Sequence, residues 1–84
     1  MINITKYSKL FNKKPGSFLD NPRIKRLIKP GEVEKGRGRG SVTLLSEKHS
    51  MEFLLWLHPT TRDMLAKGIP PTTIFEILDS YENS

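Results

Sequence analysis

Glycine and arginine alternate in the pentapeptide Gly36–Gly40, whose residue types point directly to a chemistry. A guanidinium group carries five planar N–H donors, and these match phosphate oxygens and the edge of guanine. Glycine between the arginines lets the backbone approach a nucleic acid closely. Arginines on such an arm commonly follow a groove of the duplex, above all a narrow minor groove. We therefore expect Arg37 and Arg39 to contact DNA; the alternative is a solvent-exposed hairpin tip whose arginines oppose edge-to-edge aggregation.

A second group of cations lies in the segment Arg23–Lys29, which contains four basic side chains. A short helix that presents them can lie against phosphates or place one or two residues in a major groove. The alternative is a solvated helix face. Further lysines stand at a turn and beside the glycine-rich segment. The candidate DNA-binding residues are Lys13, Lys14, Arg23, Lys25, Arg26, Lys29, Lys35, Arg37 and Arg39.

Residues that carry catalysis or bind metals do not form a recognisable pattern. Gly36–Gly40 lacks the Lys-Ser/Thr ending of a phosphate-binding P-loop. His49 and His58 are nine residues apart, and neither has a neighbour at the spacing of a metal site. The carboxylates are scattered and form no general acid/base pair. We expect a protein without enzymatic activity, metal or cofactor.

The charge of the chain is unevenly distributed. The 84 residues carry a formal net charge of +5, with 14 Lys/Arg and 9 Asp/Glu. Residues 1–50 have a net charge of +8 and residues 51–84 a net charge of −3. Such an asymmetry attracts polyanions to one side of a small domain. The length allows one domain, the absence of cysteine fits a reducing cytoplasm, and no segment is apolar enough to span a membrane.

The first half of the chain predicts short helices followed by a β-hairpin. Ile2 and Ile4 alternate with polar residues as in an edge strand, and Thr5 suits the N-cap of a helix at 6–11. A short helical piece follows at 17–20. Asn21 and Pro22 then begin a helix at 22–28, with Leu27 among its inward residues. Segments 32–35 and 41–45 flank the Gly/Arg tip as the two strands of a hairpin with a flexible tip.

The second half is predicted to be helical. A helix capped by Ser46 contains the run Met51–Leu57, which we expect to be buried on most sides, with Trp56 in the core. We expect His49 on the surface of this helix. Pro59 ends its regularity, and a further helical turn ends at Gly68, a C′ glycine. A last helix is expected at 72–82.

The order of these segments resembles the KilA-N domain. The residues that carry the resemblance are Asn3–Lys6, Phe18–Leu19, Ile24–Ile28, the glycine-rich stretch ending at Gly40, and Met51–Pro59. The resemblance covers about residues 2–68. KilA-N domains are DNA-binding domains of phages and large DNA viruses, with a fold similar to that of the fungal APSES transcription factors. The resemblance implies DNA contact through the hairpin and the basic helix, and a phage or prophage source.

The sequence thus predicts an α+β fold: a single KilA-N-like domain over residues 1–84, built of short helices with a β-hairpin wing. Its core would lie at 2–68, with a C-terminal helix at 72–82. The expected function is that of a small cytoplasmic DNA-binding protein in a bacterial host, acting as a transcriptional regulator on duplex DNA. The alternative is a protein-interaction module that inhibits or retunes a host protein through the same basic surface. RNA binding stays open, and the C-terminal helix could form a homodimer.

Overall fold

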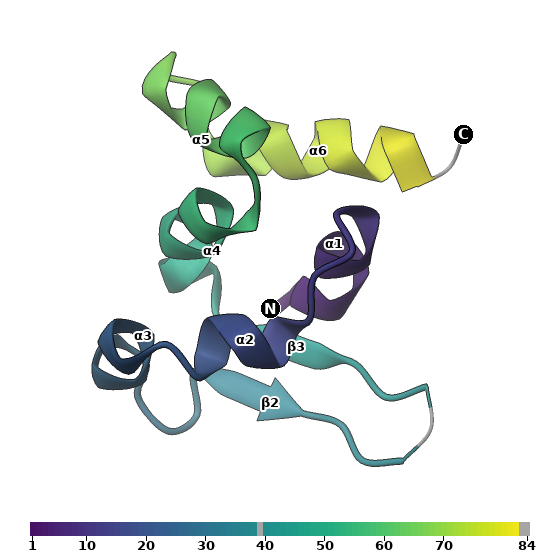
Figure 1. The fold of residues 1–84 in the computed structure, drawn as a ribbon, viewed down its shortest axis with the longest axis vertical. Coiled ribbons are helices and arrows are strands. Elements are labelled where there is room, and N and C mark those ends of the chain that lie inside the picture. The colour runs from purple at the N-terminus through teal and green to yellow at the C-terminus, as the bar shows by residue number, and fades with distance from the viewer. Residues whose placement is uncertain (39, 83–84) are drawn as a thin grey trace.

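The strands of the chain form a three-stranded antiparallel sheet (Figure 1). The computed structural model describes residues 1–38 and 40–82, without the side chain of residue 82. The strands are β1 (Ile2–Asn3), β2 (Val33–Lys35) and β3 (Thr43–Leu45), in the order β1-β3-β2. Leu45 lies opposite Ile2 on one side and Val33 on the other. The predicted edge strand and hairpin are confirmed, although β3 begins two residues later than expected.

Helix α1 (Ile4–Leu10) follows β1 without a linker. Its N-cap is Asn3, whose Oδ1 accepts a hydrogen bond from the amide of Lys6 at 3.0 Å. Thr5, the predicted cap, lies inside the helix instead. Its hydroxyl accepts a hydrogen bond from the amide of Thr43 at 2.8 Å, where β3 continues beyond its pairing with β1. The prediction of the cap was wrong because this tertiary bond competes for the threonine.

Two proline-initiated helices follow, α2 (Pro15–Leu19) and α3 (Pro22–Leu27). Proline suits the first turn because the N–H that it lacks has no partner there. Asn21 caps α3 as predicted, since its Oδ1 accepts a hydrogen bond from the amide of Arg23 at 2.9 Å. Leu27, expected to face the core, is 41% exposed. The helix has six residues, and Ile24 alone of them is buried.

The long helix predicted from Ser46 is divided in two. Ser46 caps a 3₁₀ turn, η1 (Glu47–His49), and α4 runs over Ser50–Leu57. Only one side of α4 is buried, with Phe53, Leu54 and Leu57 in the core, whereas Met51 is 57% exposed. His49, expected on the surface, is 3% exposed. Trp56 is half-buried and packs against the edge of the core rather than within it.

The remaining helices are α5 (Pro59–Ala66) and α6 (Pro71–Glu82), so the predicted C-terminal helix is confirmed. His58 separates α4 from α5 and caps α5, because its Nδ1 accepts a hydrogen bond from the amide of Thr60 at 3.1 Å. At the other end of α5 the amide of Gly68 donates to Leu65 and that of Ile69 to Met64. This pair of bonds is the Schellman motif that the C′ glycine predicted.

The core joins the sheet to the helices and confirms the predicted α+β class. Its buried apolar side chains come from every α-helix except α5 and from β3, and they are Ile4, Tyr7, Phe18, Leu19, Ile24, Leu45, Phe53, Leu54, Leu57, Ile74 and Leu78. Phe18 and Phe53 meet edge to face at 5.4 Å between ring centroids. The β2–β3 hairpin extends away from α5 and α6, at the opposite end of the molecule (Figure 1). Within the described residues no helix is long and apolar enough to cross a bilayer.

Candidate nucleic-acid interface

The tip of the hairpin is shaped by its glycines. The amide of Gly36 donates to the carbonyl of Val42 at 2.9 Å, so the two arms stay paired beyond β2 and β3. A Cβ atom at Gly36 would lie 2.8 Å from the Cβ of Ser41, which leaves no room for a side chain. Gly38 has a φ of +88°, a backbone conformation that L side chains rarely adopt. Arg37, between them, is exposed, and Arg39 lies outside the described residues.

One arm of the hairpin borders a depression that contains two of the predicted cations. Val33 and Lys35 of β2 lie on the same side of the strand, because side chains alternate along it. They line this depression together with Lys25 of α3 and the apolar side chains of α2 and α3. Asp20 lines it as well, so one carboxylate faces the two lysines. The depression therefore brings α3 and the hairpin arm into one basic surface.

The exposed cations of this region follow one edge of the molecule. Helix α3, the loop after it, strand β2 and the hairpin tip succeed one another along the lower edge of the ribbon (Figure 1). We call their exposed basic residues the basic edge: Lys25, Arg26, Lys29, Lys35 and Arg37. Within the described part of the chain, none of these side chains makes a salt bridge or a hydrogen bond. Their charges are therefore available to a ligand, although Glu34 is exposed among them.

Other predicted contacts are engaged inside the protein. Arg23 forms a salt bridge with Glu52 at 2.6 Å, which ties α3 to α4. The ammonium of Lys13 donates to the carbonyl of Trp56 at 2.9 Å and lies 4.7 Å from the centroid of its ring. This cation–π contact gives the lysine a structural role, covering a half-buried indole. Lys14 is exposed as the N-cap residue of α2.

Glu32 anchors the loop that contains Lys29 by hydrogen bonds and a salt bridge. Its Oε1 accepts a hydrogen bond from the amide of Lys29 at 2.8 Å and lies 3.0 Å from Nε2 of His49. Its Oε2 forms a salt bridge with Lys48 at 3.3 Å. The pKa of Glu32 is lowered to about 2, mainly by the hydrogen bond from the backbone amide of Lys29 and next by the hydrogen bond with His49. The loop between α3 and β2 is therefore held against η1.

A second polar cluster joins the first helix to the last. The Oδ1 atom of Asp79 in α6 accepts hydrogen bonds from Lys6 and from the hydroxyl of Tyr7, both at 2.8 Å. Lys6 is the first cause, and Tyr7 the second, of the lowered pKa of Asp79. Burial and then Asp79 raise the pKa of Tyr7 to about 12. Ile74 and Leu78 of α6 pack into the core of the same chain. A homodimer through the exposed side of this helix stays a prediction.

One cation that the sequence did not single out lies beside the other arm of the hairpin. Lys9 is exposed and lines a groove with Val42, which follows the tip on the β3 side. Its position in a short helix gave no signal, because only the fold brings α1 next to the hairpin. Among the described residues, no three His, Asp or Glu side chains are grouped so that they could hold a metal ion.

Comparison of the chain with protein-family models, with curated proteins and with solved structures found no match. What the protein binds must therefore be inferred from its own side chains.

Proposed function

We propose that this protein binds duplex DNA through the basic edge, with the hairpin tip entering a groove. The observation that carries the proposal is the succession of exposed, unpaired cations on α3, the following loop, β2 and the tip, all within the described residues. A row of cations neutralises successive phosphates and releases their counterions, which supplies most of the free energy of binding without sequence preference. Arg37 at the tip can add contacts to base edges.

The charge distribution supports one orientation on the ligand. The acidic residues of the last two helices, among them Asp63 and Glu76, belong to α5 and α6 at the end of the molecule opposite the hairpin. A polyanion is repelled from that end and attracted to the basic edge. The resemblance of Met51–Pro59 and the preceding segments to KilA-N domains favours the same ligand. On that basis we propose a DNA-binding protein of phage or prophage origin that regulates transcription.

Fluorescence anisotropy with a labelled 20-base-pair duplex tests the proposal on variants that each lack one positive charge. Lys35→Ala and Arg37→Ala should each weaken binding and reduce the slope of log K against log salt by about 0.9, the value for one phosphate contact. Lys67→Ala is the matched control, because this exposed lysine at the end of α5 lies far from the hairpin. Equal losses in all three variants would contradict a defined interface at the basic edge. An RNA duplex that competes better than the DNA would contradict DNA as the ligand.

A further inference from the structure

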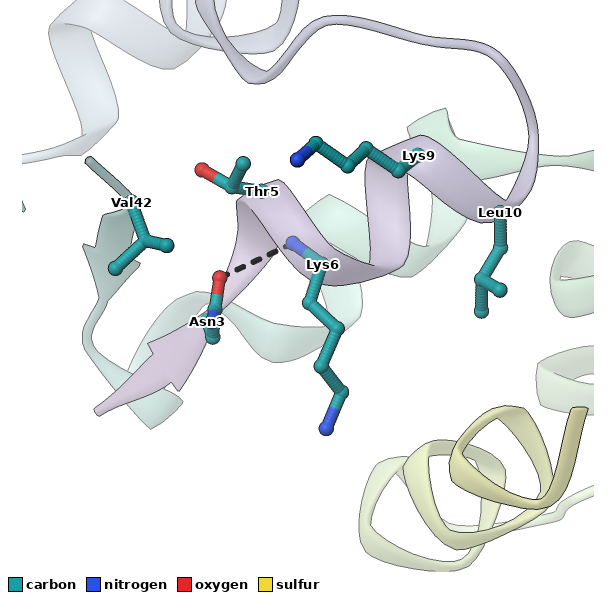
Figure 2. A pocket seen from close by; sticks show the side chains of 6 residues that line it. All are labelled: Asn3, Thr5, Lys6, Lys9, Leu10 and Val42. Carbon is teal, nitrogen blue, oxygen red and sulfur yellow. Dashed lines mark hydrogen bonds between the residues drawn. The ribbon is translucent and has the colours of Figure 1, made fainter. Parts of the chain in front are cut away.

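The hairpin has a second groove on its other arm, between β3 and α1. Figure 2 shows this groove, which has a volume of about 330 Å³. It is lined by Asn3, Thr5, Lys6, Lys9, Leu10 and Val42. Lys9 extends along α1 toward Thr5, whereas Lys6 points the other way, toward α6 (Figure 2). No carboxylate belongs to the lining of the groove, in contrast to the depression beside β2, which includes Asp20.

The polar side chains of this groove have donors to offer. The oxygen of Thr5 accepts a hydrogen bond from the amide of Thr43, which leaves its hydroxyl hydrogen free to donate. The Oδ1 atom of Asn3 caps α1, which leaves its NH₂ group free in the same way. Lys9 adds a full positive charge and makes no ion pair within the described residues. Two neutral donors and one cation, with no competing carboxylate in the lining, suit a phosphate group.

This groove and the depression beside β2 border the two arms of the hairpin. Val33 and Lys35 of the β2 arm line the depression that contains Lys25, and Val42 on the β3 arm lines the groove that contains Lys9. Each arm of the hairpin therefore borders a basic hollow. The major groove of B-DNA admits a two-stranded β-ribbon, and a ribbon that lies there has one phosphate backbone on each side.

We propose that the groove of Lys9, Thr5 and Asn3 is a second phosphate-binding site, which holds the backbone of one DNA strand while the basic edge holds the other. This inference rests on the proposed function and adds that the hairpin lies between the two strands, in the major groove. Lys9 supplies the charge, and the hydroxyl of Thr5 and the amide of Asn3 orient the phosphate oxygens. Lys6 contributes through its stem, since its ammonium is bound to Asp79.

The test uses the same duplex and measures log K against log salt for Lys9→Ala, Lys35→Ala and the variant with both changes. Lys67→Ala again controls for the loss of one positive charge, and thermal unfolding checks that each variant folds. If both strands are held at once, Lys9→Ala reduces the slope by about 0.9. The losses in log K of the two single variants then add in the double variant, since the two sites have no shared contact. Lys9→Arg, which keeps the charge, should bind close to the wild type.

Each other outcome has one meaning. If the wild type binds no duplex at low salt, the proposed function itself is wrong. If it binds, and Lys9→Ala loses no more than Lys67→Ala, the second site is wrong while DNA binding at the basic edge stands. If each single change costs no more than about twofold and the double change abolishes binding, the two hollows serve alternative binding modes. That result overturns the placement of the hairpin between two strands.

Discussion

The Nε2 atom of His49 lies 3.0 Å from Oε1 of Glu32, with the histidine buried and the glutamate at the start of the hairpin. An ionised carboxylate can only accept hydrogen bonds, so the ring nitrogen is the donor. The same oxygen accepts a bond from the amide of Lys29 at 2.8 Å. Glu32 thereby joins η1 to the loop that carries one cation of the basic edge.

We expect this arrangement to make the protein less stable in acid. The pKa of Glu32 is lowered from 4.5 to about 2, so its contribution is complete above about pH 4.5 and is lost as the pH falls toward 2. Melting temperatures measured from pH 6 to pH 2 should show part of the acid destabilisation disappearing in Glu32→Gln. The amide of glutamine has no charge to lose in this range. An unchanged pH profile in the variant would contradict the role given to Glu32.

Trp56 and Phe53 provide a comparison between a half-buried and a buried aromatic side chain in one helix. Phe53 is fully buried, and Phe53→Ala should lower the free energy of unfolding by about 3–5 kcal/mol. Trp56→Ala should cost less, because its side chain is only half-buried. The cation–π contact with Lys13, which the change also removes, contributes about 0.5–1 kcal/mol at an exposed site. Urea denaturation of both variants measures the two values. A larger cost for Trp56→Ala than for Phe53→Ala would show that the indole is a core residue after all.

The hydroxyl of Ser8 is fully buried and has no hydrogen-bond partner among the described residues. A buried polar group without a partner costs about 1–3 kcal/mol. Ser8→Ala should therefore leave the protein as stable as before or more stable. Thr61→Val serves as the opposite case, because the hydroxyl of Thr61 donates to the carbonyls of Leu54 and His58. Thermal unfolding that shows Ser8→Ala to be the more damaging change would contradict this reading of the two hydroxyls.

Arg37→Ala should weaken DNA binding without changing the stability of the fold. Its side chain is exposed and makes no hydrogen bond or ion pair with the described residues, so Arg37→Ala should change stability by no more than about 0.5 kcal/mol. The same change should weaken DNA binding and, if Arg37 contacts a base pair bidentately, reduce discrimination there by about 1–3 kcal/mol. Circular dichroism melting and competition between duplexes measure the two effects. A strong loss of stability would mean that the tip belongs to the fold.

Local signals in the sequence predicted much of the fold. Asn21 with Pro22 marked the start of α3, and Gly68 marked the end of α5, because caps depend on residues close in the chain. The choice between Asn3 and Thr5 as the cap of α1 could not be made locally. It depends on the amide of Thr43, which lies 38 residues from Thr5 and is brought to it only by the sheet.

The candidate site was predicted in composition but not in arrangement. The sequence shows every cation, yet their partners lie far along the chain: Glu52 is 29 residues from Arg23, and Trp56 is 43 residues from Lys13. Charge counts cannot distinguish such engaged cations from free ones. The buried position of His49 was missed for the same reason, since Glu32 lies 17 residues before it.

The salt dependence of binding to duplex DNA tests the central claim most directly. The wild-type protein and a labelled 20-base-pair duplex would be followed by fluorescence anisotropy from about 20 to 300 mM salt. The basic edge predicts binding at low salt that falls steeply, with each phosphate contact adding about −0.9 to the slope of log K against log salt. The absence of binding at the lowest salt, or an affinity that does not change with salt, would contradict it.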